Sequence, residues 1–167
     1  MHSKFLALVC LALPFVAFAA STPDASFFKS AAEGAIAEVQ AGRLAQDKGN
    51  SQRVKDFGAM MIKDHSAANE TLQTLAKSKN IALPTDSNVS QMAAKAVLEV
   101  LSGALFDQSY VKGQISAHRQ TIALLKKEIA SGQDPDAIAF ASATLPSVRS
   151  HLDAIKTIAT QMGLLTE

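Results

Sequence analysis

Val54-Lys-Asp-Phe-Gly-Ala-Met-Met-Ile-Lys-Asp-His-Ser-Ala-Ala-Asn-Glu-Thr-Leu-Gln-Thr-Leu75 is the stretch of sequence that decides the fold. Its apolar residues and one histidine recur at alternating gaps of three and four, at Val54, Phe57, Met61, His65, Ala68, Leu72 and Leu75. That spacing lines one side of an α-helix and does not fit the two-residue period of a strand. The pattern predicts a long amphipathic helix with His65 on its buried face.

A second long helix is predicted on the N-terminal side of this stretch. Thr22-Pro23-Asp24 is typical of a helix start, because it combines a capping hydroxyl, a proline in the first turn and an acidic residue. Gly49 is expected to end that helix. The helix that contains the opening stretch is then expected to begin at the capping residue Ser51 and to end near Asn80.

Two more long helices are predicted on the C-terminal side. A connection over residues 80–103 contains a shorter helical segment at 89–101, and a long helix then runs to Ser131-Gly132. Asp134-Pro135 starts the last helix, in which Pro146 predicts a kink or a restart. Four long amphipathic helices predict an all-α four-helix bundle with a short extra helix between the second and third. The connection is expected either to dock as a loop or to cross the length of the bundle.

The N-terminus has the pattern of a secretory signal peptide. Residues 1–19 combine a basic start, an almost unbroken apolar run and the small residues Ala17 and Ala19 of a cleavage site. The apolar run is shorter than the roughly 20 residues that a membrane-spanning helix needs. We therefore interpret residues 20–167 as one exported domain. Cys10 leaves with the signal, so no thiol chemistry is expected.

The charge of the exported domain is balanced. The whole chain has 16 Lys and Arg against 15 Asp and Glu, and the signal peptide removes Lys4. This balance argues against nucleic acid or an anionic membrane surface as a partner. No second long apolar segment follows, so no transmembrane segment is expected in the mature chain.

Each long helix carries one polar residue on or beside its apolar face: Glu38, His65, His118 and His151. At a rise of about 1.5 Å per residue, these four residues meet near the middle of the bundle in either topology of the connection. His151 lies at the edge of its stripe and is expected to face water more than the others. Three imidazoles and a carboxylate suit one ion of zinc, iron, copper or manganese. Asp64 would be either a fifth ligand or a partner that fixes an imidazole tautomer.

The alternative to a metal site is a hydrogen-bonded core network in which Glu38 accepts from a histidine. A ferritin-type di-iron centre is not predicted, because it requires a Glu-x-x-His on each of two helices. The residues three positions before the histidines are instead apolar, at Ile62, Ile115 and Val148.

No other catalytic motif is present in the sequence. It lacks a phosphate-binding glycine loop and an H-E-x-x-H motif. Asp107 and Tyr110 are expected to form a buried hydrogen bond with each other and not a catalytic pair. The sequence therefore favours a protein that is not an enzyme. If it is one, a metal-dependent oxidoreductase is the class that the residues allow.

The chain resembles the exported bacterial family called domain of unknown function 4142 in five motifs, which are Val54-Lys-x-Phe57, Met61-x-x-Asp64-His65, Phe106-Asp107-x-x-Tyr110, Gln114-x-x-x-His118 and Leu145-Pro146-x-x-x-x-His151-Leu152. Glu38 is also similar to the glutamate in that family's first helix. The resemblance implies a ferritin-like four-helix bundle in the periplasm or at the outer membrane. It implies no established activity.

Taken together, the residues and the resemblance predict an exported ferritin-like bundle, periplasmic if the source is Gram-negative. We expect a role in metal handling or in envelope stress protection, through one transition-metal ion at Glu38, His65, His118 and His151. The alternative is a non-enzymatic structural or protein-interaction module whose His/Glu network only fixes the core.

Overall fold

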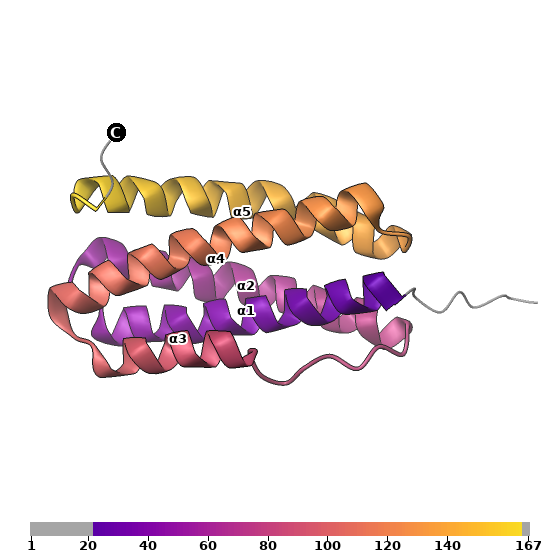
Figure 1. Cartoon of the computed structure of the whole chain (residues 1–167), viewed down its shortest axis with the longest axis horizontal. Helices are drawn as coiled ribbons and strands as arrows, with labels where there is room; N and C mark the ends of the chain where they lie inside the picture. Colours follow the sequence, from indigo (N-terminus) through magenta and orange to yellow (C-terminus); the bar gives the residue numbers. More distant parts are fainter. Residues whose placement is uncertain (1–21, 165–167) are drawn as a thin grey trace, which may run out of the picture.

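The computed structural model of the chain describes residues 22–164, which form five α-helices and no strand. The helices are α1 (Thr22–Lys48), α2 (Gln52–Ser78), α3 (Val89–Val100), α4 (Gly103–Ser131) and α5 (Pro135–Gln161). The four long helices form a bundle, and α3 packs along α1 and α4 (Figure 1). The prediction of an all-α four-helix bundle with a short extra helix is confirmed. The predicted signal peptide lies outside the described residues.

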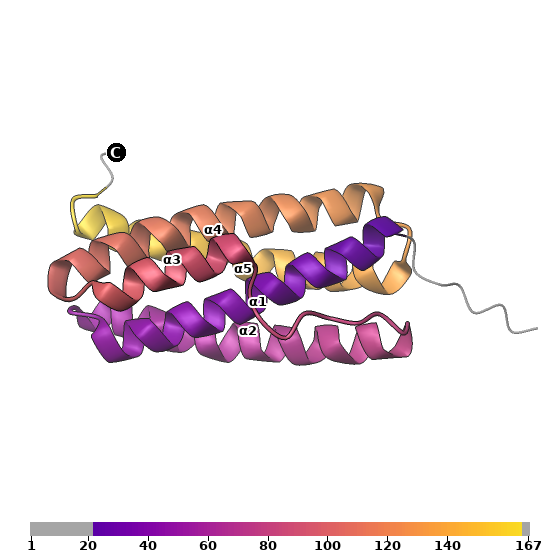
Figure 2. The ribbon, with the colours of Figure 1, turned by 60° about the horizontal axis from the view of Figure 1, so that its bottom comes forward.

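Two sets of long-range contacts show in which direction each helix runs along the bundle. The backbone N–H groups of Asn50 and Ser51 each donate to the carboxylate of Asp107 at 2.8 Å, so α2 and α4 begin at the same end. At the other end, Lys79 Nζ lies 2.8 Å from Asp134 Oδ2, so α5 begins where α2 ends. Helices α2 and α4 therefore run parallel, and the connection between them crosses the length of the bundle (Figure 2). A single long crossover is one of the known topologies of four-helix bundles.

The use of Asp107 in this contact corrects one expectation. Asp107 was expected to hydrogen-bond Tyr110, but its carboxylate accepts from the turn between α1 and α2. The hydroxyl of Tyr110 is buried and has no hydrogen-bond partner within residues 22–164. The physical reason is that two backbone N–H groups at the start of α2 need an acceptor, and an ionised carboxylate satisfies both.

Local capping residues set the helix ends where the sequence predicts them. Ser51 accepts from the N–H of Val54 at 3.3 Å, and Asn88 begins α3 with a capping box. Asp134 accepts from the first turn of α5. Helix α5 continues through Pro146, so the expected restart does not occur. Buried residues on both sides of the proline, such as Ala141 and Val148, hold the helix against the bundle despite the lost hydrogen bond.

Helices α1 and α2 touch backbone to backbone at a pair of glycines. A Cβ built on Gly42 would lie 2.7 Å from the carbonyl oxygen of Gly58, and one built on Gly58 would lie 2.7 Å from that of Gly42. No side chain fits at either position unless the helices separate. The absence of a side chain at Gly42, one turn after Glu38, therefore allows α1 and α2 to approach closely.

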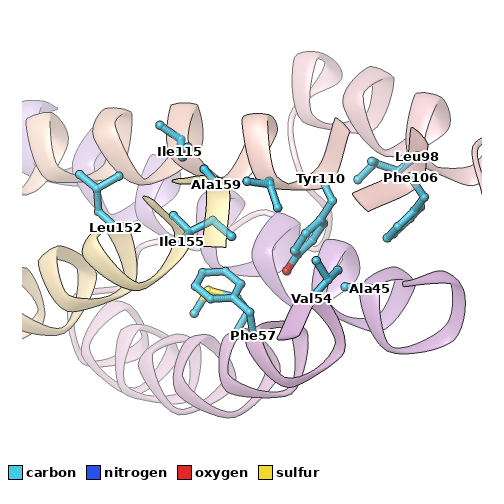
Figure 3. Close-up of a cluster of buried hydrophobic side chains, with 12 residues drawn as sticks. Ala45, Val54, Phe57, Leu98, Phe106, Tyr110, Ile115, Leu152, Ile155 and Ala159 are labelled. Atoms are coloured by element: carbon cyan, nitrogen blue, oxygen red, sulfur yellow. The ribbon is translucent and has the colours of Figure 1, made fainter. Parts of the chain in front are cut away.

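The apolar side chains form two clusters, one toward each end of the bundle. The first is drawn in Figure 3 and consists of Ala45, Val54, Phe57, Met61, Leu98, Phe106, Tyr110, Val111, Ile115, Leu152, Ile155 and Ala159. The second consists of Phe27, Phe28, Leu72, Ala76, Leu125, Ala137, Phe140, Ala141 and Val148. Glu38 and the three histidines are buried polar residues that belong to neither cluster. No helix within residues 22–164 has both the length and the apolar character needed to cross a bilayer.

Candidate metal centre

Three histidines from three helices meet in the interior of the bundle. His65 of α2, His118 of α4 and His151 of α5 have exposed fractions of 7%, 1% and 4%. Their ring centroids are 5.6–6.0 Å apart, and one ring nitrogen from each lies within 4.8 Å of the other two. The expectation that His151 faces water more than the others is wrong, because His151 is less exposed than His65. A wheel drawn on one helix does not show that a residue of a neighbouring helix, Asp64 of α2, covers that edge.

Hydrogen bonds fix the tautomers of two of the rings. His118 Nδ1 donates to the backbone carbonyl of Gln114 at 2.9 Å. His151 Nε2 donates to Asp64 Oδ2 at 2.9 Å. A neutral imidazole has one N–H and one lone pair, so His118 Nε2 and His151 Nδ1 carry the lone pairs. Of the two roles predicted for Asp64, the structure shows the partner that orients an imidazole.

The remaining nitrogens of the three rings are left without partners. His65 Nε2, His118 Nε2 and His151 Nδ1 are all buried, and none has a hydrogen-bond partner within residues 22–164. A buried polar atom without a partner costs about 1–3 kcal/mol. The three atoms belong to the three rings that meet in the interior, so they are candidate ligands for a metal ion.

Burial in the interior of the bundle keeps these imidazoles neutral. Burial, together with the neighbouring His118 and His151, lowers the pKa of His65 to about 3. Burial also lowers the pKa of His118 and that of His151, although the Gln114 carbonyl and Asp64 act in the opposite direction. At neutral pH an incoming ion therefore has no proton to displace from these rings.

Glu38 lies beside the histidines but outside the convergent set of nitrogens. Its Oε1 is 3.9 Å from His118 Nδ1, which is longer than a hydrogen bond, and this nitrogen already donates to the Gln114 carbonyl. The network in which Glu38 accepts from a histidine is therefore absent from residues 22–164. Burial raises the pKa of Glu38 to about 7, although the hydrogen bond from Gln114 and the nearby His151 lower it.

Sequence reasoning gave no site role to three further buried polar groups, Tyr110, Gln114 and Glu128. Tyr110 and Gln114 lie close to Glu38, and each has a buried oxygen without a partner in the part of the chain described. At the end of α4, Ile129 is 36% exposed, whereas its neighbour Glu128 is buried. Glu128 is three residues after the buried Leu125, a spacing that could have identified it.

Glu128 is buried next to another acidic residue, Asp24 of α1. Burial raises the pKa of Glu128 to about 7, and a hydrogen bond to Asp24 and the charges of Asp24 and Asp134 act in the same direction. A hydrogen bond between two carboxyl groups requires a proton on one of them, which explains the direction of the shift.

Comparison with known protein families assigns the chain to one family. The family model described as Domain of unknown function (DUF4142) matches residues 15–158. The chain belongs to this family. The motifs that indicated the resemblance span Val54 to Leu152, so they lie within the matched region. No curated protein matches the chain in sequence.

Solved structures with the same fold are distant in sequence. A DUF305 fragment from Deinococcus radiodurans superposes with a TM-score of 0.75 at 10% identity, over 87% of this chain and 99% of its own. A DUF305 protein from Streptomyces coelicolor, named as secreted, has a TM-score of 0.73 at 13% identity, over 87% and 96%. CopM in its Cu(I)-bound form has a TM-score of 0.69 at 12% identity, over 83% and 96%. At these identities the likeness establishes the bundle alone.

Proposed function

We propose that this DUF4142 domain binds a single transition-metal ion through His65, His118 and His151. Glu38 beside His118 would supply the carboxylate that balances the charge of the ion. The observation that carries the proposal is that each of the three adjacent histidines has a buried ring nitrogen without a hydrogen-bond partner in residues 22–164. An ion that accepts all three lone pairs would remove their desolvation cost at once.

The geometry is close to what an ion needs. A metal at about 2.0–2.1 Å from each imidazole would bring the three nitrogens to about 3.3–3.6 Å from one another. Nitrogens within 4.8 Å reach that spacing by small rotations of the rings. Asp64 and the Gln114 carbonyl already hold two of the rings by their other nitrogens, as outer partners of metal-binding histidines do.

Among the metals that the sequence allows, the site favours copper in its Cu(I) state. Imidazole suits copper, zinc and iron, whereas manganese prefers oxygen ligands. The three histidines are neutral and buried, and the cost of burying an ion rises steeply with its charge, so a monovalent ion is favoured over a divalent one. Cu(I) also accepts three ligands. The Cu(I)-bound structure of CopM, which has the same fold, supports this choice.

The cellular role we propose is metal handling outside the cytoplasm. The signal-peptide pattern in residues 1–19 supports export, and so does the same fold in a DUF305 protein that is named as secreted. A buried site of three histidines suits tight holding of an ion, which would limit free copper in the cell envelope and protect it under stress. In a Gram-negative source the compartment would be the periplasm.

A titration of the metal-free protein tests the proposal. Cu(I), added anaerobically at neutral pH, should raise the melting temperature and bind with one ion per chain. The stabilisation should grow with excess ion, to about 2.7 kcal/mol at one hundred times the dissociation constant. His65→Ala, His118→Ala and His151→Ala should each remove most of that rise. Gln120→Ala, at an exposed position of α4, is the matched control and should keep it.

Two further measurements distinguish binding at this site from non-specific binding of metal to the protein. X-ray absorption of the loaded protein should show nitrogen ligands at about 2.0 Å. Asp64→Ala should weaken binding by about 10–100-fold, the usual effect of removing an outer partner. If neither copper, zinc, iron nor manganese changes the melting temperature, the histidines are a structural feature of the core and the proposal is wrong.

A further inference from the structure

A cleft opens between α1, α3 and α4, separate from the histidine nitrogens. Its volume is about 530 Å³, within the range of about 300–1,000 Å³ that is typical of small-molecule sites. Small residues make up much of its walls, among them Gly34, Ala37, Ala94, Gly113 and Ala117. None of the three histidines lines this cleft.

Three of the residues that line the cleft each carry a buried polar atom without a hydrogen-bond partner in the part of the chain described. These atoms are Glu38 Oε2, the hydroxyl oxygen of Tyr110 and Gln114 Oε1. The three residues are at most 5% exposed. Because unsatisfied buried polar groups are rare in folded proteins, three on one cleft point to a ligand that supplies the missing contacts.

Two glycines of the cleft have no packing reason to be glycine. A Cβ added to Gly34 or to Gly113 would meet nothing within 4 Å, unlike one added to Gly42 or Gly58, which would strike the backbone of the facing helix. Glycine inside a helix costs about 0.5–1 kcal/mol relative to alanine. At Gly34 and Gly113 the absence of a side chain keeps the cleft open.

The polar groups of the lining residues indicate which functional group a ligand would carry. The carboxyl oxygen of Glu38 and the amide oxygen of Gln114 are acceptors, and the Tyr110 hydroxyl both donates and accepts. A ligand with N–H donors matches this set, whereas a carboxylate or phosphate would face acceptor oxygens. Lys95 is the one cationic residue among those that line the cleft in the described chain, and its ammonium is paired with Glu99 at 2.5 Å.

We propose that the cleft between α1, α3 and α4 binds a small organic molecule through an amino or ammonium group, held by Glu38, Gln114 and Tyr110. The body of the ligand would lie between the glycine and alanine walls. The ammonium would give the Glu38 carboxylate the cationic partner that it lacks among the lining residues. Glu38 also approaches His118, so this site adjoins the histidine cluster and does not include it.

The test uses the metal-free protein and n-butylammonium as the probe. Butylammonium should shift the NMR signals of the Gly34 and Gly113 amides in a saturable way. n-Butyrate, an anion of similar size, should not bind. Glu38→Gln keeps the shape of the side chain and removes its charge, and should weaken butylammonium binding at least tenfold. Since no metal is present, the result is independent of the copper titration.

A pair of variants shows whether the cleft itself is the site. Gly113→Leu places a side chain in the open space and should abolish binding, while the protein remains folded because no atom lies near the new Cβ. Ala123→Leu adds the same side chain at an exposed position of α4 outside the cleft, and should bind butylammonium like the parent. If butylammonium does not saturate, if butyrate binds equally well, or if Gly113→Leu has no effect, the cleft holds only water and the proposal is overturned.

Discussion

The same substitution, glycine to alanine, should have opposite effects at two helical positions. Gly58 lies inside α2 and Gly113 lies inside α4. The Cβ of alanine at Gly58 would lie 2.7 Å from the Gly42 carbonyl oxygen and 2.8 Å from the Ala45 Cβ, whereas at Gly113 it would meet nothing within 4 Å. The first site is closed by the facing helix, and the second is open to the cleft.

The change in the free energy of unfolding of each variant follows from two effects, helix preference and packing. Alanine is favoured over glycine in a helix interior by about 1 kcal/mol, and this gain applies to both variants. At Gly113 it is the only effect, so Gly113→Ala should stabilise the protein by about 0.5–1 kcal/mol. At Gly58 the α1 and α2 backbones must separate, at an overpacking cost of about 1–3 kcal/mol. Because the helix preference cancels between the two variants, their difference measures the packing cost alone.

Urea denaturation followed by circular dichroism measures this difference. The variants should differ by about 1–3 kcal/mol in the free energy of unfolding at an unchanged m-value. In a thermal scan, each kcal/mol should correspond to about 3–4 °C for a domain of this size. If Gly113→Ala destabilises the protein, the space beside Gly113 is not open and the argument for the cleft loses one of its supports. If Gly58→Ala is as stable as Gly113→Ala, the close contact between α1 and α2 is not present in solution.

Two further predictions concern the core and the buried acids. Leu72 is 1% exposed in the second apolar cluster, so Leu72→Ala should lower the free energy of unfolding by about 2–5 kcal/mol, and a loss under half a kcal/mol in urea denaturation would mean that the site is not buried. The carboxyl of Glu128 has a pKa of about 7 in the folded protein against 4.5 for the ordinary group, so between these pH values the unfolded state ionises and the folded state resists ionisation. Its contribution to stability is therefore present below pH 4.5 and is lost as the pH rises toward 7. Glu128→Gln should be more stable than the parent at pH 8, and this advantage should shrink toward pH 4.5 in paired melting curves; an advantage that does not change with pH would contradict the shift.

Much of the fold could be predicted because helix ends and helix faces are local properties. Ser51, Asn88 and Asp134 cap helices through backbone groups two or three residues away, so a short window of sequence contains both partners. The apolar period of three and four needs no knowledge of the neighbouring helix. The level of Glu38 and the three histidines follows from the constant rise of a helix, and the structure brings all four together.

The path of the connection could not be predicted in the same way. It depends on contacts between residues more than 50 positions apart, such as Asp107 with the turn at Asn50 and Lys79 with Asp134. A docked loop and a crossover have the same local signals. Only the pairing of distant charges and backbone groups distinguishes them.

The sequence by itself determined the four long helices, their ends and the meeting of one polar residue from each near mid-bundle. Tertiary structure alone decided that His151 is buried against Asp64, that the Tyr110 hydroxyl has no partner among the described residues and that the cleft stays open beside Gly113. The physical reason is the sequence distance over which each kind of interaction acts. Hydrogen bonds within a helix link residues about four apart, whereas burial and cavities depend on how closely separate helices approach and how they are rotated.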